Sequence, residues 1–152
     1  MQKILKICEE IEQIVAEIYR HWQSVFIDDP ALSALWGKMA DDELDHVRQV
    51  QLAKRVVSDN VFTVGEVSME SLEKSLARAR QLLKDVRSRA VSSESALKAA
   101  IKIEDEFSKA HLLNATRVVD SSMKAMFQSL SRADDQHVAT LKNYYNAYIK
   151  KD

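Results

Sequence analysis

The sequence has few of the residues that interrupt regular secondary structure, with two glycines and one proline among 152 residues. A β-rich or α/β fold of this length needs more turn residues than that, so the composition predicts a few long helices. Cys8 is the one cysteine, which excludes an internal disulfide, a CxxC pair and a cysteine-based zinc cluster. The length suits one domain with a real hydrophobic core and is too short for two ordinary ones.

The sequence also lacks a strong charge of one sign and a long apolar run. Its net charge is -1, its pI is about 6.4, and lysine and arginine are spread along the chain. This distribution does not resemble the basic surface of a nucleic-acid-binding protein. No uninterrupted apolar run approaches the roughly 18 residues of a transmembrane helix, and the N-terminal MQKILKICEE lacks the apolar core of a signal peptide. We therefore expect a soluble cytoplasmic protein that binds neither nucleic acid nor a membrane.

Apolar residues recur at helical spacing in five segments, which predicts an all-α fold. The segment VFTVGEVS at 61–68 is predicted as a connection between the second and third helices. Serines at 92–95 and the DSS turn at 120–122 provide N-caps for the last two helices. The predicted helices cover about 2–26, from 31 to about 57, about 69–90, from the 92–95 caps to about 119, and from the 120–122 turn to near the C-terminus.

An internal repeat relates the first two helices to the last two. ALWGKMADDELDHV at 34–47 aligns with AMFQSLSRADDQHV at 125–138. LKICEEIE at 5–12 aligns with LKAAIKIE at 97–104. The first two helices therefore form one hairpin, and the last two form its copy.

The repeat defines the organisation of the chain. We predict a first hairpin at about 2–58, a second at about 92–150, and a long, partly helical crossover at about 59–91. Together they are predicted to form a single domain over residues 1–152.

Each of the four repeated helices has one carboxylate on its apolar stripe, and in two of them a histidine follows one turn later. A buried carboxylate without a partner costs several kcal/mol, and no lysine or arginine lies near these acids on the stripes. Two divalent cations would balance the four carboxylates. The arrangement matches the known pattern of a two-metal carboxylate site in a four-helix bundle. The candidate metal ligands are Glu12, Glu43, His46, Glu104, Asp134 and His137.

These motifs, in this order on two repeated hairpins, resemble the ferritin-like superfamily and most closely its rubrerythrin branch. The helices of that branch often contain A-I-x-x-E with a tyrosine seven residues after the glutamate. AIKIE at 100–104 and the spacing of Glu12 and Tyr19 are similar to that pattern. The resemblance implies a ferritin-like antiparallel four-helix bundle that holds a carboxylate-bridged pair of metals, usually two iron ions, with manganese or zinc as alternatives.

The resemblance also implies roles for the candidate ligands. Glu43 and Asp134 would bridge the two metals, and Glu12 and Glu104 would each bind one of them. His46 and His137 would complete the two positions. Tyr19 and His111, each seven residues after a candidate glutamate ligand, are candidates for side chains that support the ligands without binding metal. The implied function is an oxidoreductase that reduces peroxide or O₂ with electrons from an external donor.

Three features depart from the rubrerythrin pattern. Asp134 replaces the usual glutamate, and Phe107 stands where rubrerythrins usually have a second glutamate on the third bundle helix. Since the chain has one cysteine, it has no rubredoxin domain, and the electron donor would be a separate, rubredoxin-like protein. A ferroxidase that handles iron and a degenerate bundle that serves as an interaction module are the alternatives. In each case we expect a homodimer.

Overall fold

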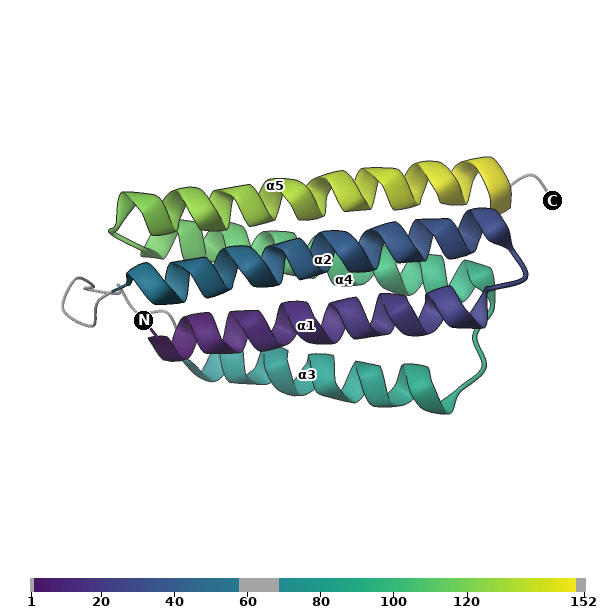
Figure 1. Cartoon of the computed structure of the whole chain (residues 1–152), viewed down its shortest axis with the longest axis horizontal. Helices are drawn as coiled ribbons and strands as arrows, with labels where there is room; N and C mark the ends of the chain where they lie inside the picture. Colours follow the sequence, from purple (N-terminus) through teal and green to yellow (C-terminus); the bar gives the residue numbers. More distant parts are fainter. Residues whose placement is uncertain (1, 58–68, 150–152) are drawn as a thin grey trace. The chain divides into compact units, whose positions relative to one another are not determined.

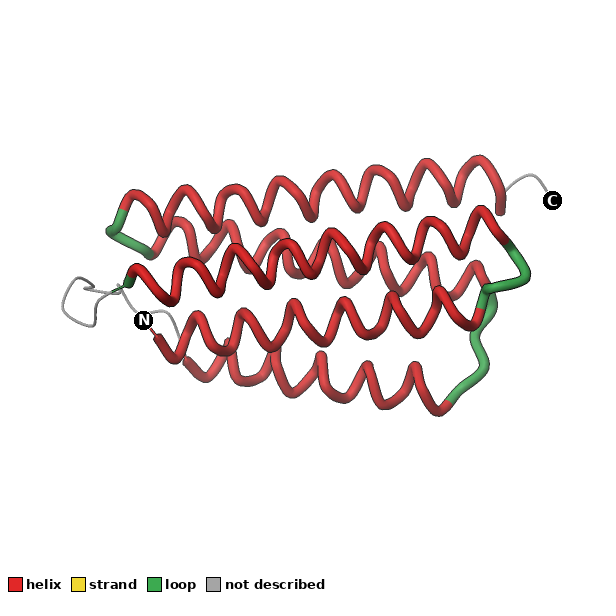
Figure 2. The backbone as a smooth tube through the Cα atoms, in the orientation of Figure 1, coloured by secondary structure: helices red, strands yellow, loops and turns green. Residues whose placement is uncertain are grey.

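The computed structural model describes residues 2–57 and 69–149, and this part of the chain is helical, with no strand (Figures 1 and 2). The predicted all-α class is confirmed, and the first four helices end one or two residues before their predicted ends. The predicted connection at 61–68 lies outside the described residues. The elements are α1 Gln2–Val25, α2 Pro30–Val56, α3 Met69–Ser88, α4 Ser93–Arg117, α5 Ser121–Tyr144 and a π-helix η1 Tyr145–Ile149.

Three of the helices begin at side chains that cap them. The carboxylate of Asp29 accepts a hydrogen bond from a backbone N–H three residues later at 3.0 Å, and Pro30 is the first residue of α2. Ser92 and Asp120 cap α4 and α5 in the same way, at 3.1 and 2.8 Å. Because the caps satisfy amide groups that have no partner inside the helix, these residues fix where each helix starts.

The chain divides into two compact units, which we call the first unit (residues 1–90) and the second unit (residues 91–152). In the first unit, α1 and α2 form an antiparallel pair, and α3 packs against α1. Helical spacing through α2 predicts a buried stripe, and every member of it is buried: Leu32, Trp36, Met39, Glu43, His46, Val50, Ala53 and Val57. Three ion pairs also join α1 to α3: Lys3 with Glu73, Glu10 with Arg80, and Glu17 with Arg87.

In the second unit, α4 and α5 form an antiparallel pair that corresponds to the second predicted hairpin. The buried hydroxyl of Ser108 joins the two helices by donating to Asp135 at 2.6 Å and lying 3.1 Å from the hydroxyl of Ser131. Helical spacing continues the apolar stripe of the last segment from Leu141 through Tyr144 to Tyr148 and predicts that Tyr148 is buried. This prediction is wrong, because Tyr148 is 61% exposed. It lies in η1, where its ring stacks on Tyr144 with centroids 4.4 Å apart.

Candidate metal centre

All six candidate ligands lie on the buried faces of α1, α2, α4 and α5. Each acid is at most 3% exposed, and His46 and His137 are 3% and 7% exposed. Helical spacing places Glu17 and Glu106 on polar faces and predicts that both are solvated. About half of the Glu17 side chain is exposed, as predicted, whereas Glu106 is partly buried.

The first unit brings together Glu12 from α1 with Glu43 and His46 from α2, and we call these three residues the first cluster. Nδ1 of His46 lies 3.3 Å from Oε2 of Glu12 and 3.2 Å from Oε2 of Glu43. One ligand atom from each of the three residues lies within 4.8 Å of the others, so the cluster could hold a metal ion. Glu43 and His46 reach the same point because residues three apart share a face of the helix.

The charge of His46 is the main electrostatic feature of the first cluster. Burial disfavours the protonated imidazole, but the hydrogen bonds and negative charges of Glu12 and Glu43 outweigh burial and raise the pKa of His46 to about 11. At neutral pH the metal-free cluster therefore contains an imidazolium between two carboxylates. His46 therefore provides a cation on the apolar stripe of α2, where the sequence, with histidine taken as neutral, offers none.

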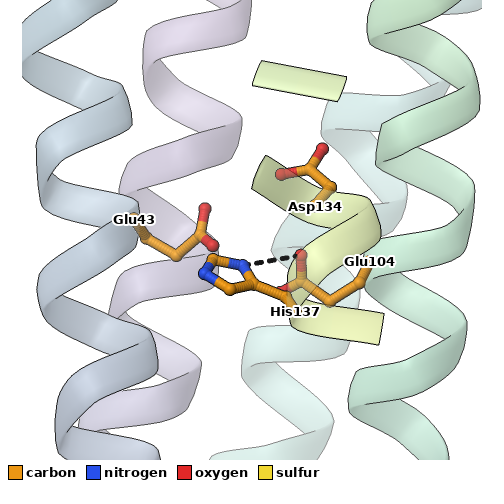
Figure 3. Close-up of side chains that lie close together, drawn as sticks. All are labelled: Glu43, Glu104, Asp134 and His137. Atoms are coloured by element: carbon orange, nitrogen blue, oxygen red, sulfur yellow. Dashed lines mark hydrogen bonds and ion pairs between the residues drawn. The ribbon is translucent and has the colours of Figure 1, made fainter. Parts of the chain in front are cut away.

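The second unit brings together Glu104 from α4 with Asp134 and His137 from α5, and we call these three residues the second cluster (Figure 3). Nδ1 of His137 lies 3.2 Å from Oε2 of Glu104, across the helix pair. One ligand atom from each of the three residues again lies within 4.8 Å of the others. Each unit thus supplies two buried carboxylates and one imidazole from its own helices.

Tyr19 and His111 occupy matching positions beside the two clusters. In the repeat, Tyr19 aligns with His111 and Trp36 with Phe127. The ring of Tyr19 stacks on Trp36 with centroids 5.6 Å apart, and the ring of His111 stacks on Phe127 with centroids 6.2 Å apart. The repeat therefore extends from the ligands to a stacked ring pair in each unit, which sequence reasoning missed although the repeat alignment contained the signal.

His111 also contacts the second cluster. Its Nε2 lies 3.6 Å from Oδ2 of Asp134, and both side chains are buried. Tyr19 belongs to a buried aromatic group in which Trp22 is the third ring, with its centroid 4.9 Å from that of Trp36 and 5.9 Å from that of Tyr19. The two units therefore share the kind of ligand cluster and differ in the residue at this matching position.

Cys8 and Phe107 add no ligand atom to either cluster. Cys8 is 3% exposed, and its burial, with the negative charge of Glu12 as a smaller cause, raises the pKa of the thiol to about 12. The thiol therefore stays protonated, whereas metals bind the thiolate. Phe107, at the place of the second rubrerythrin glutamate, is partly buried and apolar.

None of the helices in the described part of the chain has the length and apolar character of a membrane span.

In comparisons with protein-family models, with curated proteins and with solved structures, nothing matches this chain. The ferritin-like family and the rubrerythrin branch therefore stay predictions from the motifs. The chain is an all-helical protein with two buried carboxylate–histidine clusters that could hold metal ions.

Proposed function

We propose that the chain is a dinuclear metal protein of rubrerythrin type, in which each cluster holds one metal ion. The observation that supports this best is duplication: two units related by an internal repeat each bury two carboxylates and an imidazole within 4.8 Å. A single buried acid pair has many structural explanations. Burying two carboxylates and an imidazole costs free energy of folding. We expect a chain to bury this group twice, at matching positions, where both copies bind the same kind of ligand.

The donor set suits divalent transition metals. Carboxylate oxygens and imidazole nitrogens together favour iron, manganese or zinc, and the absence of thiolate ligands argues against a soft-metal site. Two divalent cations would balance the charge of the four carboxylates, with the histidines neutral. In the first cluster the metal would replace the proton of His46, since a histidine binds metal in its neutral form.

We further propose that the two hairpins pack as a ferritin-like antiparallel four-helix bundle, with the clusters at one level of its core. A pair of helices cannot cover an apolar stripe on its own, so each hairpin needs another layer against this face. In this arrangement Glu43 and Asp134 would be shared between the metals, and the remaining four residues would each bind one metal.

When bound, a pair of iron ions supplies the two electrons that reduce peroxide to water or begin the reduction of O₂. The residues of the chain would hold the metals through the six ligands and keep bulk water away, since all six residues are at most 7% exposed. Re-reduction requires an external electron donor, which we propose is a small redox protein of rubredoxin type. We propose a homodimer in the cytoplasm as the working form, and a ferroxidase that handles iron as the variant of this function that uses the same ligands.

A metal-free helical module is the second candidate function, and one observation favours it. The imidazolium of His46 lies 3.3 and 3.2 Å from two carboxylates, so the first cluster is partly neutralised without any metal. In this case the clusters would specify how the helices pair, and the chain would act through a binding partner.

Metal analysis separates these candidates. Chain purified without chelator and reloaded anaerobically with Fe(II) is expected to hold two metals, one per cluster, and then to consume peroxide when a reductant is supplied. The double variant Glu12→Ala, Asp134→Ala should hold clearly less metal. The matched control Glu17→Ala, Asp105→Ala removes exposed acids from α1 and α4 and should bind like the wild type.

The other outcomes each identify an alternative. Iron loading far beyond two ions per chain in a cage-like assembly would indicate the ferroxidase. A wild-type protein that is fully helical and takes up no metal would contradict the dinuclear proposal and leave the helical module.

A further inference from the structure

The two clusters differ at the acid that precedes the histidine. In the first cluster this acid is Glu43, and His46 holds it from one turn away at 3.2 Å. In the second cluster it is Asp134, whose side chain is one methylene shorter. A shorter side chain reaches less far from α5, so the position of its carboxylate depends on what α4 places beside it.

His111 is placed to do this. It comes from α4, two turns after Glu104, and its Nε2 lies 3.6 Å from Oδ2 of Asp134. Its ring is 4% exposed and is held flat against Phe127, with an angle of 26° between the ring planes. The separation is about half an ångström beyond ordinary hydrogen-bond length, so a small rotation of the carboxylate closes it.

His111 is a separate contributor and not a further member of the ligand group. Ligand atoms of Glu104, Asp134 and His137 lie within 4.8 Å of one another, and His111 does not belong to that group. Its Nε2 lies next to one carboxylate oxygen of the candidate ligand Asp134. In metal sites, hydrogen bonds from such neighbours orient the ligand, and their removal typically lowers metal affinity by roughly 10- to 100-fold.

We propose that His111 is a positioning residue that orients Asp134, and that it makes the metal position of the second unit chemically different from that of the first. This inference rests on the proposed dinuclear function. The matching position in the first unit is Tyr19, a phenol stacked on Trp36, so the first cluster has no second imidazole at this place. The two metal positions are therefore inequivalent, because the second has an imidazole beside Asp134 and the first unit has the Tyr19 ring at the matching place.

Cobalt(II) titration tests this inference without requiring enzymatic activity. The visible absorption of Co(II) reports its binding to each position, and the wild type should take up two equivalents. His111→Phe keeps a flat ring against Phe127 and removes the nitrogen. We expect it to weaken the equivalent bound by the second cluster by about 10- to 100-fold and to weaken the other equivalent less, because Asp134 is only one of the ligands of that position.

Two further variants separate positioning from packing. His111→Gln keeps an N–H donor at a similar reach and should bind Co(II) almost as the wild type does. Adding Asp134→Glu to His111→Phe restores the missing methylene and should recover much of the lost affinity. If His111→Phe does not fold, His111→Leu takes its place in the same series.

The titration separates failure of the positioning role from failure of the dinuclear function. A wild type that binds no Co(II) would contradict both the dinuclear function and the role of His111. A wild type that binds two equivalents, together with a folded His111→Phe variant that binds them equally well, overturns the role of His111 alone. Equal weakening in His111→Phe and His111→Gln, without recovery by Asp134→Glu, would also contradict the positioning role.

Discussion

The substitution Glu12→Gln tests whether each unit holds its own metal. It removes one anionic ligand from the first cluster, keeps the size of the side chain and leaves the second cluster intact. A ligand present at about a hundred times its dissociation constant stabilises the folded state by about 2.7 kcal/mol per site. Two clusters therefore contribute about 5 kcal/mol, which raises the melting temperature of a chain of this size by about 10–20 °C.

With Glu12→Gln, we expect about half of this rise, because only the second cluster keeps its full set of ligands. The assay is thermal unfolding followed by circular dichroism or calorimetry, with chelator and then with Co(II) or Mn(II) at the same free concentration for every variant. Glu17→Gln, an exposed acid on the same helix, is the control and should retain the whole rise.

Two results would refute this reasoning. If Glu12→Gln removes the entire metal-dependent rise, the two positions do not bind independently. If it removes none, Glu12 is not a ligand, and the first cluster is a structural ion pair centred on His46.

Three other predictions concern pH, packing and capping. The pKa of His46 is raised from 6.5 to about 11, so its contribution to the stability of the metal-free protein is complete below about pH 6.5 and is lost as the pH rises towards 11. Melting curves of the metal-free wild type should therefore lose stability relative to His46→Gln over this range. Trp36 is fully buried between two other rings, and Trp36→Ala should lower the free energy of unfolding by about 3–5 kcal/mol in denaturant titrations. Asp120→Ala removes the cap of α5 and should cost about 0.5–2 kcal/mol in the same assay, with Asp120→Asn as a control that keeps the cap.

Much of the helical framework could be predicted from the sequence, because the signals are local. Asp29 with Pro30, Ser92 and Asp120 mark where helices begin, and the apolar period shows which faces are buried. The end of α5 could not be predicted in this way. The change to π-helical winding in η1 depends on hydrogen bonds that a 3.6-residue period does not register, and the same period does not show that Tyr148 is exposed.

The burial of the six candidate ligands could be predicted from the sequence, and their contacts with one another could not. Spacing alone placed all six acids and histidines on buried faces. It could not show that Nδ1 of His46 would contact two carboxylates, because the charge of a histidine depends on distances between helices. The contact of His111 with Asp134 could not be predicted for a similar reason. It depends on the register of the antiparallel helices α4 and α5, which places Asp134 beside His111.

The way α3 is attached to α1 gives the first unit a weak point. Only Leu72, Leu76 and Ala79 of α3 are buried, and the ion pairs that join it to α1 are largely exposed. Exposed ion pairs contribute little and are screened by salt, so detachment of α3 costs much less free energy than separation of α1 from α2. In hydrogen exchange, the amides of α3 should therefore exchange first, and faster at high ionic strength. The amides of α1 and α2, which carry the first cluster, should stay protected from exchange, because this helix pair is more stable than its contact with α3.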